Sequence, residues 1–310
     1  FLEAGHILGS AIVELTVRVN GAECKVVYTG DLGRRNKVVL RDPEVVNDCD
    51  VLILESTYGD RIHEETTVRK DILLDVIERT RERGGKVIIP SFAIERAQEL
   101  LYILNDLVES GAMRPLPVFV DSPMAVEALR VFERHVELYD KEATARVQQG
   151  DQPFSFAGLH LIATVEESKR LNTFDEPCVI IAGSGMCTGG RIKHHLKHNI
   201  EDPRSTILFV GYQARGTLGR QIADGAKRVR IFGEHYQVRA EVTCMHGFSG
   251  HADQNELLWW TSEFDDAPMQ VFLVHGESDA LNALCAKLQE RRWRCSIPSL
   301  ADIWQMHYEV

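Results

Sequence analysis

Two histidines and one aspartate in this sequence have side chains that could bind zinc, and two of these three residues follow strand-like segments. His6 lies in AGHILGS, Asp31 lies in TGDLGR directly after a strand, and His275 lies in LVHGE at the end of an apolar strand. Neutral imidazoles and carboxylates are common ligands of Zn²⁺, and an aspartate can also bridge two ions. Each residue also has an ordinary interpretation, as a hydrogen-bonded loop histidine or as a turn-forming aspartate.

A second candidate pair is Glu55, in LILESTYGD, and His251, in GFSGHAD. Glu55 ends an apolar run of the kind that is buried, where an unpaired carboxylate would be costly. His251 could pair with it, because a carboxylate bonded to one imidazole nitrogen fixes the tautomer and raises the basicity of the other nitrogen. The alternatives are a surface carboxylate for Glu55 and a residue at a helix start for His251.

The segments around these residues predict two kinds of architecture. Residues 11–19 alternate apolar and polar, and with 24–29 and 51–55 they predict short strands of a mixed sheet. After a helix predicted over 66–83, strands and helices alternate, which is typical of a parallel sheet covered on both faces. The predicted strands are 86–90, 116–120, 178–182 and 206–210, and the helices between them begin near residues 94, 125, 190 and 217.

The last part of the chain returns to strand-like runs, at 228–232 and 236–245. A helix over 254–264, a strand over 270–275 and a helix over 279–292 follow. We therefore predict one domain made from both ends of the chain, residues 1–59 and 231–310, with an α/β domain inserted at 60–230.

Four loops of the predicted α/β domain share a pattern in which a strand is followed by small or hydroxyl residues and then by a helix start. Helix N-termini present free N–H groups to anions, and glycine lets the backbone approach closely. The pattern predicts phosphate contacts, although ordinary helix capping is the alternative. The predicted substrate-binding residues are Ser91, Arg96, Ser122, Met124, Ser184, Gly185, Met186, Thr188, Arg191, Gln213 and Thr217.

The composition excludes some classes of protein. The chain has 310 residues, of which 44% are hydrophobic, and a net charge of −11, which argues against a protein that coats nucleic acid non-specifically. No segment approaches the roughly 18 apolar residues of a membrane helix. The seven cysteines form no CxxC pair, which favours reduced thiols and a cytoplasmic location over a zinc site made from cysteines.

Taken in order, the motifs AGHILGS, GDLGR, ESTYGD, GFSGHAD and LVHGE resemble those of the metallo-β-lactamase-fold β-CASP nucleases. Four further segments resemble the bacterial and archaeal members, which are related to the cleavage and polyadenylation specificity endonuclease: IPSFAIERAQELL, VDSPMA, GSGMCTGGR and GYQARGTLGRQ. The resemblance implies an α/β fold, with a partial αββα metallo-β-lactamase sandwich and an inserted, doubly wound parallel β-CASP domain.

The resemblance also assigns roles. It implies that His6 binds a first zinc ion, that Asp31 bridges two zinc ions and orients the attacking hydroxide, and that His275 binds the second ion. It implies that Glu55 pairs with His251, which would donate a proton to the leaving group. The family's HxHxDH motif is absent from the 310 residues, and the chain begins without Met, so we expect an N-terminally truncated and inactive fragment.

The implied function is two-metal hydrolysis of RNA, endonucleolytic or from the 5′ end, with single-stranded RNA held between the two domains. His275 favours RNA over DNA, because the RNA-directed members tend to carry histidine in that motif. The resemblance also makes a homodimer plausible. The alternatives are a non-catalytic, scaffold-like relative in an RNA-processing complex, and a nuclease directed at DNA or a hydrolase of small phosphodiesters.

Overall fold

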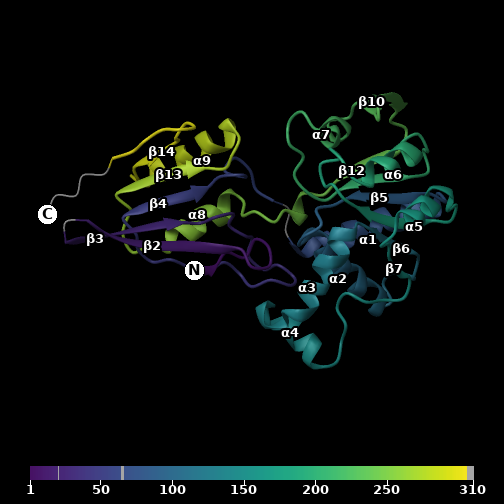
Figure 1. Ribbon diagram of the computed structural model, residues 1–310, viewed down its shortest axis with the longest axis horizontal. Coiled ribbons are helices and arrows are strands. Elements are labelled where there is room, and N and C mark those ends of the chain that lie inside the picture. Colours follow the sequence, from purple (N-terminus) through teal and green to yellow (C-terminus); the bar gives the residue numbers. More distant parts are fainter. Residues whose placement is uncertain (20, 64–65, 306–310) are drawn as a thin grey trace. The chain divides into compact units, whose positions relative to one another are not determined.

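The computed structural model describes residues 1–19, 21–63 and 66–305, and the chain divides into two compact units. Unit 1 comprises Phe1–His63 and Gly250–Val310, and unit 2 comprises Glu64–Ser249 (Figure 1). Each unit is built around its own six-stranded sheet. None of the described helices has the length and apolarity that a membrane crossing requires.

The sheet of unit 1 is mixed, as its short and closely spaced strands predict. Its first three strands pair antiparallel, and the third to sixth strands pair parallel. In spatial order, the strands are β1 (Leu2–Glu3), β2 (Ala11–Val19), β3 (Ala22–Tyr28), β4 (Val51–Glu55), β13 (Gln270–Val274) and β14 (Cys295–Ser296). The parallel strands β3, β4 and β13 are neighbours, so their carboxyl ends lie at one edge of the sheet.

Two helices, α8 (Gln254–Ser262) and α9 (Ser278–Glu290), cover one face of this sheet. Alternate strand residues point to that face and are removed from water together with apolar residues of the helices. Buried members of this core include Ile12, Val27, Leu52, Leu54, Leu257, Trp260, Val271, Leu273, Leu284 and Leu288. A capping box fixes the start of α8, because Asp253 and Glu256 each accept the other's backbone N–H.

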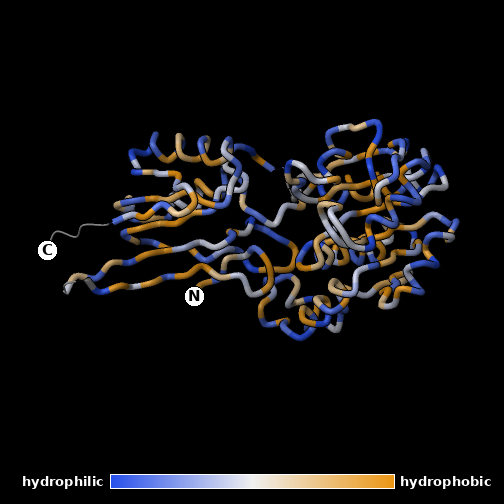
Figure 2. The backbone as a smooth tube through the Cα atoms, turned by 45° about the horizontal axis from the view of Figure 1, so that its top comes forward, coloured by the Kyte–Doolittle hydropathy of each residue, from blue (hydrophilic) through white to orange (hydrophobic). Residues whose placement is uncertain are grey.

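The sheet of unit 2 is parallel throughout. In spatial order, its strands are β12 (Glu241–Cys244), β9 (Thr206–Phe209), β5 (Lys86–Pro90), β8 (Cys178–Ala182), β6 (Val118–Asp121) and β7 (Leu159–Leu161). The central strands are continuous apolar runs, because both faces of the sheet are covered. Figure 2 shows this apolar interior and the hydrophilic outer loops.

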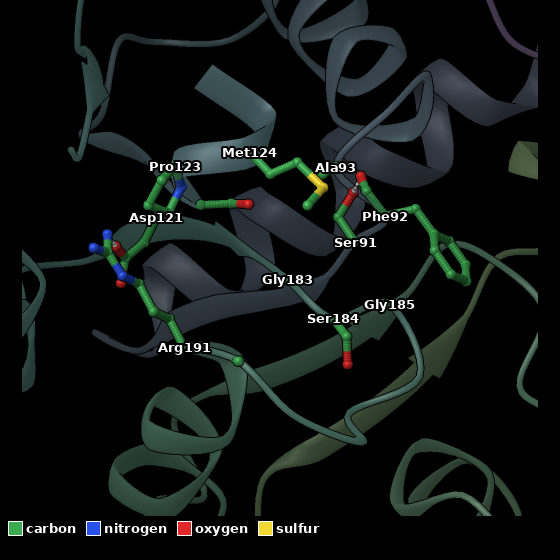
Figure 3. A pocket seen from close by; sticks show the side chains of 12 residues that line it. Ser91, Phe92, Ala93, Asp121, Pro123, Met124, Gly183, Ser184, Gly185 and Arg191 are labelled. Carbon is green, nitrogen blue, oxygen red and sulfur yellow. Dashed lines mark hydrogen bonds and ion pairs between the residues drawn. The ribbon is translucent and has the colours of Figure 1, made fainter. Parts of the chain in front are cut away.

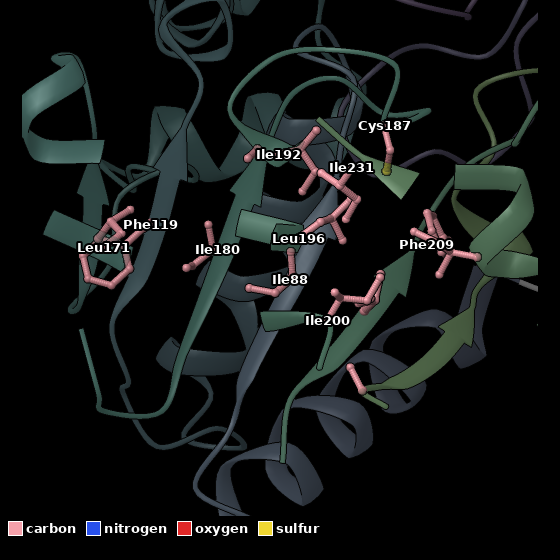
Figure 4. Packing of buried hydrophobic residues seen from close by; sticks show 14 of the residues in the cluster. Ile88, Phe119, Leu171, Ile180, Cys187, Ile192, Leu196, Ile200, Phe209 and Ile231 are labelled. Carbon is pink, nitrogen blue, oxygen red and sulfur yellow. The ribbon is translucent and has the colours of Figure 1, made fainter. Parts of the chain in front are cut away.

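Helices lie on both faces of the second sheet. The isoleucines and leucines of α6 and α7 form one cluster with Ile88, Ile180 and Phe209 of the strands (Figure 4). The helix α1 contacts β5 on the side opposite α6 (Figure 1). The helices of unit 2 are α1 (Thr66–Glu82), α2 (Arg96–Glu109), α3 (Pro123–Arg134), α4 (Lys141–Gln148), α5 (Val165–Arg170), α6 (Ile192–Asn199) and α7 (Leu218–Ala223). Short 3₁₀ helices are η1 (Val136–Leu138), η2 (Leu171–Thr173) and η3 (His246–Phe248).

Residues 228–245 contain strands, as the sequence predicts, but these strands belong to unit 2. They form a separate hairpin of β10 (Arg228–Ile231) and β11 (Glu234–Gln237), followed by β12, which pairs parallel with β9 of unit 2. The domain boundary placed after residue 230 therefore falls inside unit 2, which ends at Ser249. The alternation of residues 236–245 indicates strands but not the sheet to which they pair, because parallel pairing joins segments distant in sequence.

Candidate metal centre

Asp31 and His275 approach each other at the carboxyl edge of the sheet in unit 1. Asp31 follows β3 and His275 follows β13, and the distance between Asp31 Oδ1 and His275 Nδ1 is 3.1 Å. His275 has a φ of 52°, in the left-handed region that few residues other than glycine adopt, although histidine adopts it more often than most. The Thr57 hydroxyl stabilises this conformation, since it donates to the His275 carbonyl at 3.1 Å and lies 3.2 Å from Nδ1.

His6 reaches the same place from the loop between β1 and β2. The Ser10 hydroxyl accepts the backbone N–H groups of His6 and Ile7, at 3.1 and 3.2 Å, and so fixes the loop. The distance between His6 Nε2 and Asp31 Oδ2 is 3.8 Å. Gly33 allows this approach, because a Cβ at that position would lie only 1.9 Å from the Gly5 carbonyl oxygen.

Glu55 ends β4 and is fully buried, and both oxygens of its carboxylate accept hydrogen bonds. Its Oε1 accepts the Leu32 N–H at 2.8 Å and lies 3.0 Å from His251 Nδ1, and its Oε2 accepts the Thr57 N–H at 3.1 Å. Burial acts to raise the pKa of Glu55, but the charge and hydrogen bond of His251 and the bonds from Thr57 hold that pKa below its usual value. Glu55 is therefore an anionic partner of His251, as the sequence predicted.

The three histidine rings are neighbours. The ring centroids of His6 and His251 are 4.3 Å apart, and those of His251 and His275 are 5.6 Å apart. Among the residues that the structure describes, two groups have potential ligand atoms within 4.8 Å of one another, namely His6 with Asp31 and His251, and Glu55 with His251 and His275. His251, which the sequence analysis placed beside the leaving group, thus also lies among the candidate ligands.

The donor set fits a zinc ion. Burial, with a smaller effect of His251, lowers the pKa of His6 to about 3, so its imidazole is neutral at physiological pH. Neutral imidazole is the form that binds metals, and a carboxylate beside it supplies the negative charge that a divalent cation requires. In contrast, the carboxylate oxygens of Glu55 already accept hydrogen bonds from Leu32, Thr57 and His251. This arrangement suits a residue that orients a metal ligand or a proton donor better than a residue that binds the metal.

Sequence reasoning missed His63 and Tyr58, which support the loop that carries His251. His63 Nε2 lies 3.3 Å from the His251 carbonyl oxygen, and its backbone N–H donates to Asp253 Oδ2 at 2.8 Å. The Tyr58 ring contacts the His63 ring edge-on, with centroids 4.4 Å apart. Neither residue lies in a segment with helical or strand periodicity, so only the proximity of His63 to Glu55 in sequence could have indicated it.

Several loops predicted to bind substrate line one cavity of about 490 Å³ in unit 2 (Figure 3). Of the predicted residues, it brings together Ser91, Ser122, Met124, Ser184, Gly185 and Arg191. These loops follow β5, β6 and β8, whose carboxyl ends lie side by side. Phe92 and Asp121 also line the cavity and were not among the predicted contacts.

The remaining predicted substrate-binding residues have contacts that support the fold. Arg96 is only 5% exposed and forms an ion pair with Glu99 in α2. Gln213 Nε2 donates to the Gly185 carbonyl at 2.9 Å, and the Thr217 hydroxyl caps α7. The Met186 carbonyl accepts the Gly219 N–H at 3.1 Å, and the Thr188 hydroxyl lies 3.2 Å from that of Ser184.

The arginine of this cavity is held by the buried carboxylate of Asp121, which belongs to the segment VDSPMA and was not among the predicted site residues. Asp121 lies 2.6 Å from each of Arg191 Nη1, His195 Nε2 and Ser168 Oγ. Burial acts to raise the pKa of Asp121, but these three hydrogen bonds hold that pKa below its usual value. Figure 3 shows the Arg191 guanidinium directed at Asp121, so the guanidinium is fixed beside the cavity.

Comparison with known proteins gives matches over nearly the whole chain. A family model described as the Beta-Casp domain matches residues 97–222, and one described as the Zn-dependent metallo-hydrolase RNA specificity domain matches residues 235–298. The chain is 46% identical over 304 residues to ribonuclease TTHA0252 of Thermus thermophilus, which covers 97% of this chain and 68% of that relative.

Two proteins of Methanocaldococcus jannaschii are also similar. The chain is 36% identical to transcription termination factor FttA, over 88% of this chain and 44% of that protein. It is 36% identical to an RNase J-like protein, over 89% of this chain and 63% of that protein. The chain thus spans between about half and two thirds of the length of these relatives.

Proposed function

Because the chain belongs to the metallo-β-lactamase-fold β-CASP family of ribonucleases, we propose that it contributes to a zinc-dependent ribonuclease that hydrolyses RNA phosphodiester bonds. The expected fold class, a mixed α/β chain with a β-CASP domain, is confirmed. The main support for the activity is that residues 6, 31, 55, 251 and 275, from five separate segments, converge at one edge of the sheet. We further propose that unit 1 is part of the metallo-β-lactamase domain and that unit 2 is the β-CASP domain.

The proposed zinc ligands on this chain are His6, Asp31 and His275, with Asp31 between the two histidines. Two bound Zn²⁺ ions would supply positive charge that polarises the phosphodiester and activates a water molecule. Asp31 suits a shared ligand because its two oxygens face different histidines, Oδ2 toward His6 and Oδ1 toward His275.

His251 is the proposed proton donor to the oxygen that leaves. Glu55 holds Nδ1 of His251 at 3.0 Å, so the proton that moves to the leaving oxygen is the one on Nε2. A buried carboxylate that stays ionised stabilises the imidazolium before the proton is transferred. In unit 2, the hydroxyls of Ser91, Ser122 and Ser184 and the Arg191 guanidinium are the proposed contacts to RNA phosphates and riboses.

The test is a cleavage assay of the full-length protein with RNA and DNA oligonucleotides of the same sequence, together with a measurement of bound zinc. We expect two zinc ions per chain, cleavage of the RNA, and loss of cleavage after chelation. Preference for DNA would contradict the proposed substrate. A folded protein that holds no zinc and cleaves neither strand would instead support the scaffold-like alternative. A homodimer and a cytoplasmic location stay predictions.

A further inference from the structure

The hairpin of β10 and β11 in unit 2 has one apolar face and one cationic face. Val229 and Ile231 are buried in the cluster formed with α6 and α7. Arg228 and Arg230 alternate with them and are exposed. His235 pairs directly with Arg230 across the hairpin and lies on the same outer face. A chain with a net charge of −11 thus presents two neighbouring arginines, with a histidine beside them, on this hairpin.

An aromatic ring occupies the tip of the same hairpin. Phe232 has a φ of 50° and is 49% exposed, and Gly233 follows it with a φ of 87°. Two-residue hairpin turns with positive φ at both positions favour Asn-Gly, so the turn itself does not account for a phenylalanine. The Phe232 ring centroid lies 4.6 Å from that of His194 and 4.8 Å from Lys193 Nζ. Phe232 is thus a half-exposed ring beside the Lys193 ammonium group and the His194 imidazole of α6, and such a ring can stack on a nucleobase.

The start of α6 links this hairpin to a lining residue of the cavity described above. Arg191 lines the cavity in unit 2, and α6 begins with the next residue. Lys193 and His194 belong to the first turn of α6, and they contact the hairpin tip. The nearest acidic group on the hairpin, Glu234, is paired with Lys197 at 3.3 Å, which reduces its repulsion of phosphates.

We propose that these residues form a second contact surface for single-stranded RNA, which holds nucleotides beyond those in the cavity. This cationic hairpin surface is defined as Lys193, His194, Arg228, Arg230, Phe232 and His235. The arginines contact phosphates, and a base stacks on Phe232. The inference rests on the proposed function, because it takes RNA as the ligand, and it adds that longer strands bind more tightly than strands that fill only the cavity.

The first experiment uses the variant Phe232→Asn in the full-length protein. Asparagine suits a positive φ, so the free energy of unfolding should be unchanged or higher, while the stacking ring is lost. Binding is followed by the fluorescence anisotropy of labelled oligouridine with a chelator present to prevent cleavage. For a strand of about 20 nucleotides, we expect a Kd at least about five-fold weaker than that of the wild type, with no change for about 5 nucleotides.

The second experiment removes the charges. The double variant Arg228→Gln/Arg230→Gln should lower the slope of log Kd against log salt concentration by about 1.4, because each phosphate contact on a single strand contributes about 0.7. The control Arg130→Gln/Arg134→Gln removes two exposed arginines of α3 and should leave the slope unchanged.

Three outcomes separate the hypotheses. The proposal that the cationic hairpin surface binds RNA is wrong if Phe232→Asn binds the long strand as tightly as the wild type. It is also wrong if the double variants of the hairpin and of α3 change the salt slope equally. In either case the ribonuclease proposal stands. If the wild type binds RNA with the expected length dependence but never cleaves it, only the ribonuclease proposal fails. A wild type that binds no RNA overturns both.

Discussion

The two units use the carboxyl ends of parallel strands in different ways. In unit 1, the residues that follow β3 and β13 contact each other, with Asp31 Oδ1 and His275 Nδ1 only 3.1 Å apart. In unit 2, the residues that follow β5, β6 and β8 line an open cavity of about 490 Å³. The first arrangement suits a small cation and the second suits a ligand of nucleotide size.

Both sites nevertheless share one structural feature, a buried carboxylate at the end of a strand. Glu55 accepts hydrogen bonds from Leu32, Thr57 and His251, and Asp121 accepts them from Arg191, His195 and Ser168. In each case burial acts to raise the pKa of the carboxyl group, but the hydrogen-bonding partners lower that pKa by more, so the carboxylate is ionised. One anion fixes a histidine of the proposed metal centre and the other fixes an arginine of the cavity.

The largest effect is expected from removal of a proposed zinc ligand. Asp31→Ala and His275→Ala should each lower cleavage of RNA by about a thousand-fold or more, because a metal supplies several kcal/mol of charge stabilisation in the transition state. Zinc content should fall with activity, while the circular dichroism spectrum is unchanged. Asp60→Ala is the control, since this carboxylate pairs with Arg61 outside the cluster. Near-normal turnover of either variant with zinc would refute the ligand assignment.

Asp121→Asn should lower the stability of unit 2 rather than the rate of the chemical step. Loss of the buried anion leaves Arg191 and His195 without their partner, which should lower the free energy of unfolding by about 3 kcal/mol at neutral pH. The folded pKa of Asp121 lies below its ordinary value of 3.8, so its contribution is complete above that value and is lost as the pH falls through the folded pKa.

The difference in the free energy of unfolding between the wild type and Asp121→Asn should therefore become smaller as the pH falls below 3.8. Urea unfolding across this range measures it. Asp224→Asn, which removes an exposed carboxylate paired with Arg220 in the same unit, provides the control and should change stability little. A gap that is constant with pH would show that the charge of Asp121 is not the source of the effect.

Glu55→Gln tests the role of the buried carboxylate in unit 1. The amide keeps the shape of the side chain but cannot stabilise an imidazolium, so cleavage should fall about 10- to 100-fold with less loss of zinc than in Asp31→Ala. The comparison of activity with zinc content decides the role of the residue. If Glu55→Gln loses as much zinc as Asp31→Ala, Glu55 is itself a ligand.

Asp31, Glu55 and His275 were predictable because each lies at or just after the end of a strand whose pattern is readable, whereas His6 and His251 were assigned by the family resemblance. Continuous apolar runs such as 51–54 and 271–274 indicate buried strands, and parallel neighbours must end at one edge. The pairing of β12 with β9 was not predicted, because nothing in a short strand specifies a distant partner. The elements β7, α4 and α5 were missed, since they have three, eight and six residues and are too short to show a period.

The candidate residues of unit 2 were harder to predict because small and hydroxyl residues after strands have several roles. Thr217 caps α7 and Gln213 bonds the Gly185 carbonyl, whereas Ser122 both caps α3 and lines the cavity. Arg96 lies three residues before Glu99, a spacing that also suits an exposed ion pair on a helix. Only the packing of other segments around α2 buries this pair.

The smallest expected effect comes from a comparison of Arg191, which lines the cavity, with Arg96, which is buried in α2. The same substitution can be made at both residues. Arg191→Lys keeps a positive charge near Asp121 but loses the fork that also contacts the carbonyls of Ile162 and Ala163. The KM for RNA should rise about 5- to 10-fold with little change in kcat. Arg96→Lys should leave KM unchanged and lower the free energy of unfolding, because its partner Glu99 is buried. If Arg96→Lys raises KM as much as Arg191→Lys does, the effect reflects general loosening of unit 2 rather than contact with RNA in the cavity.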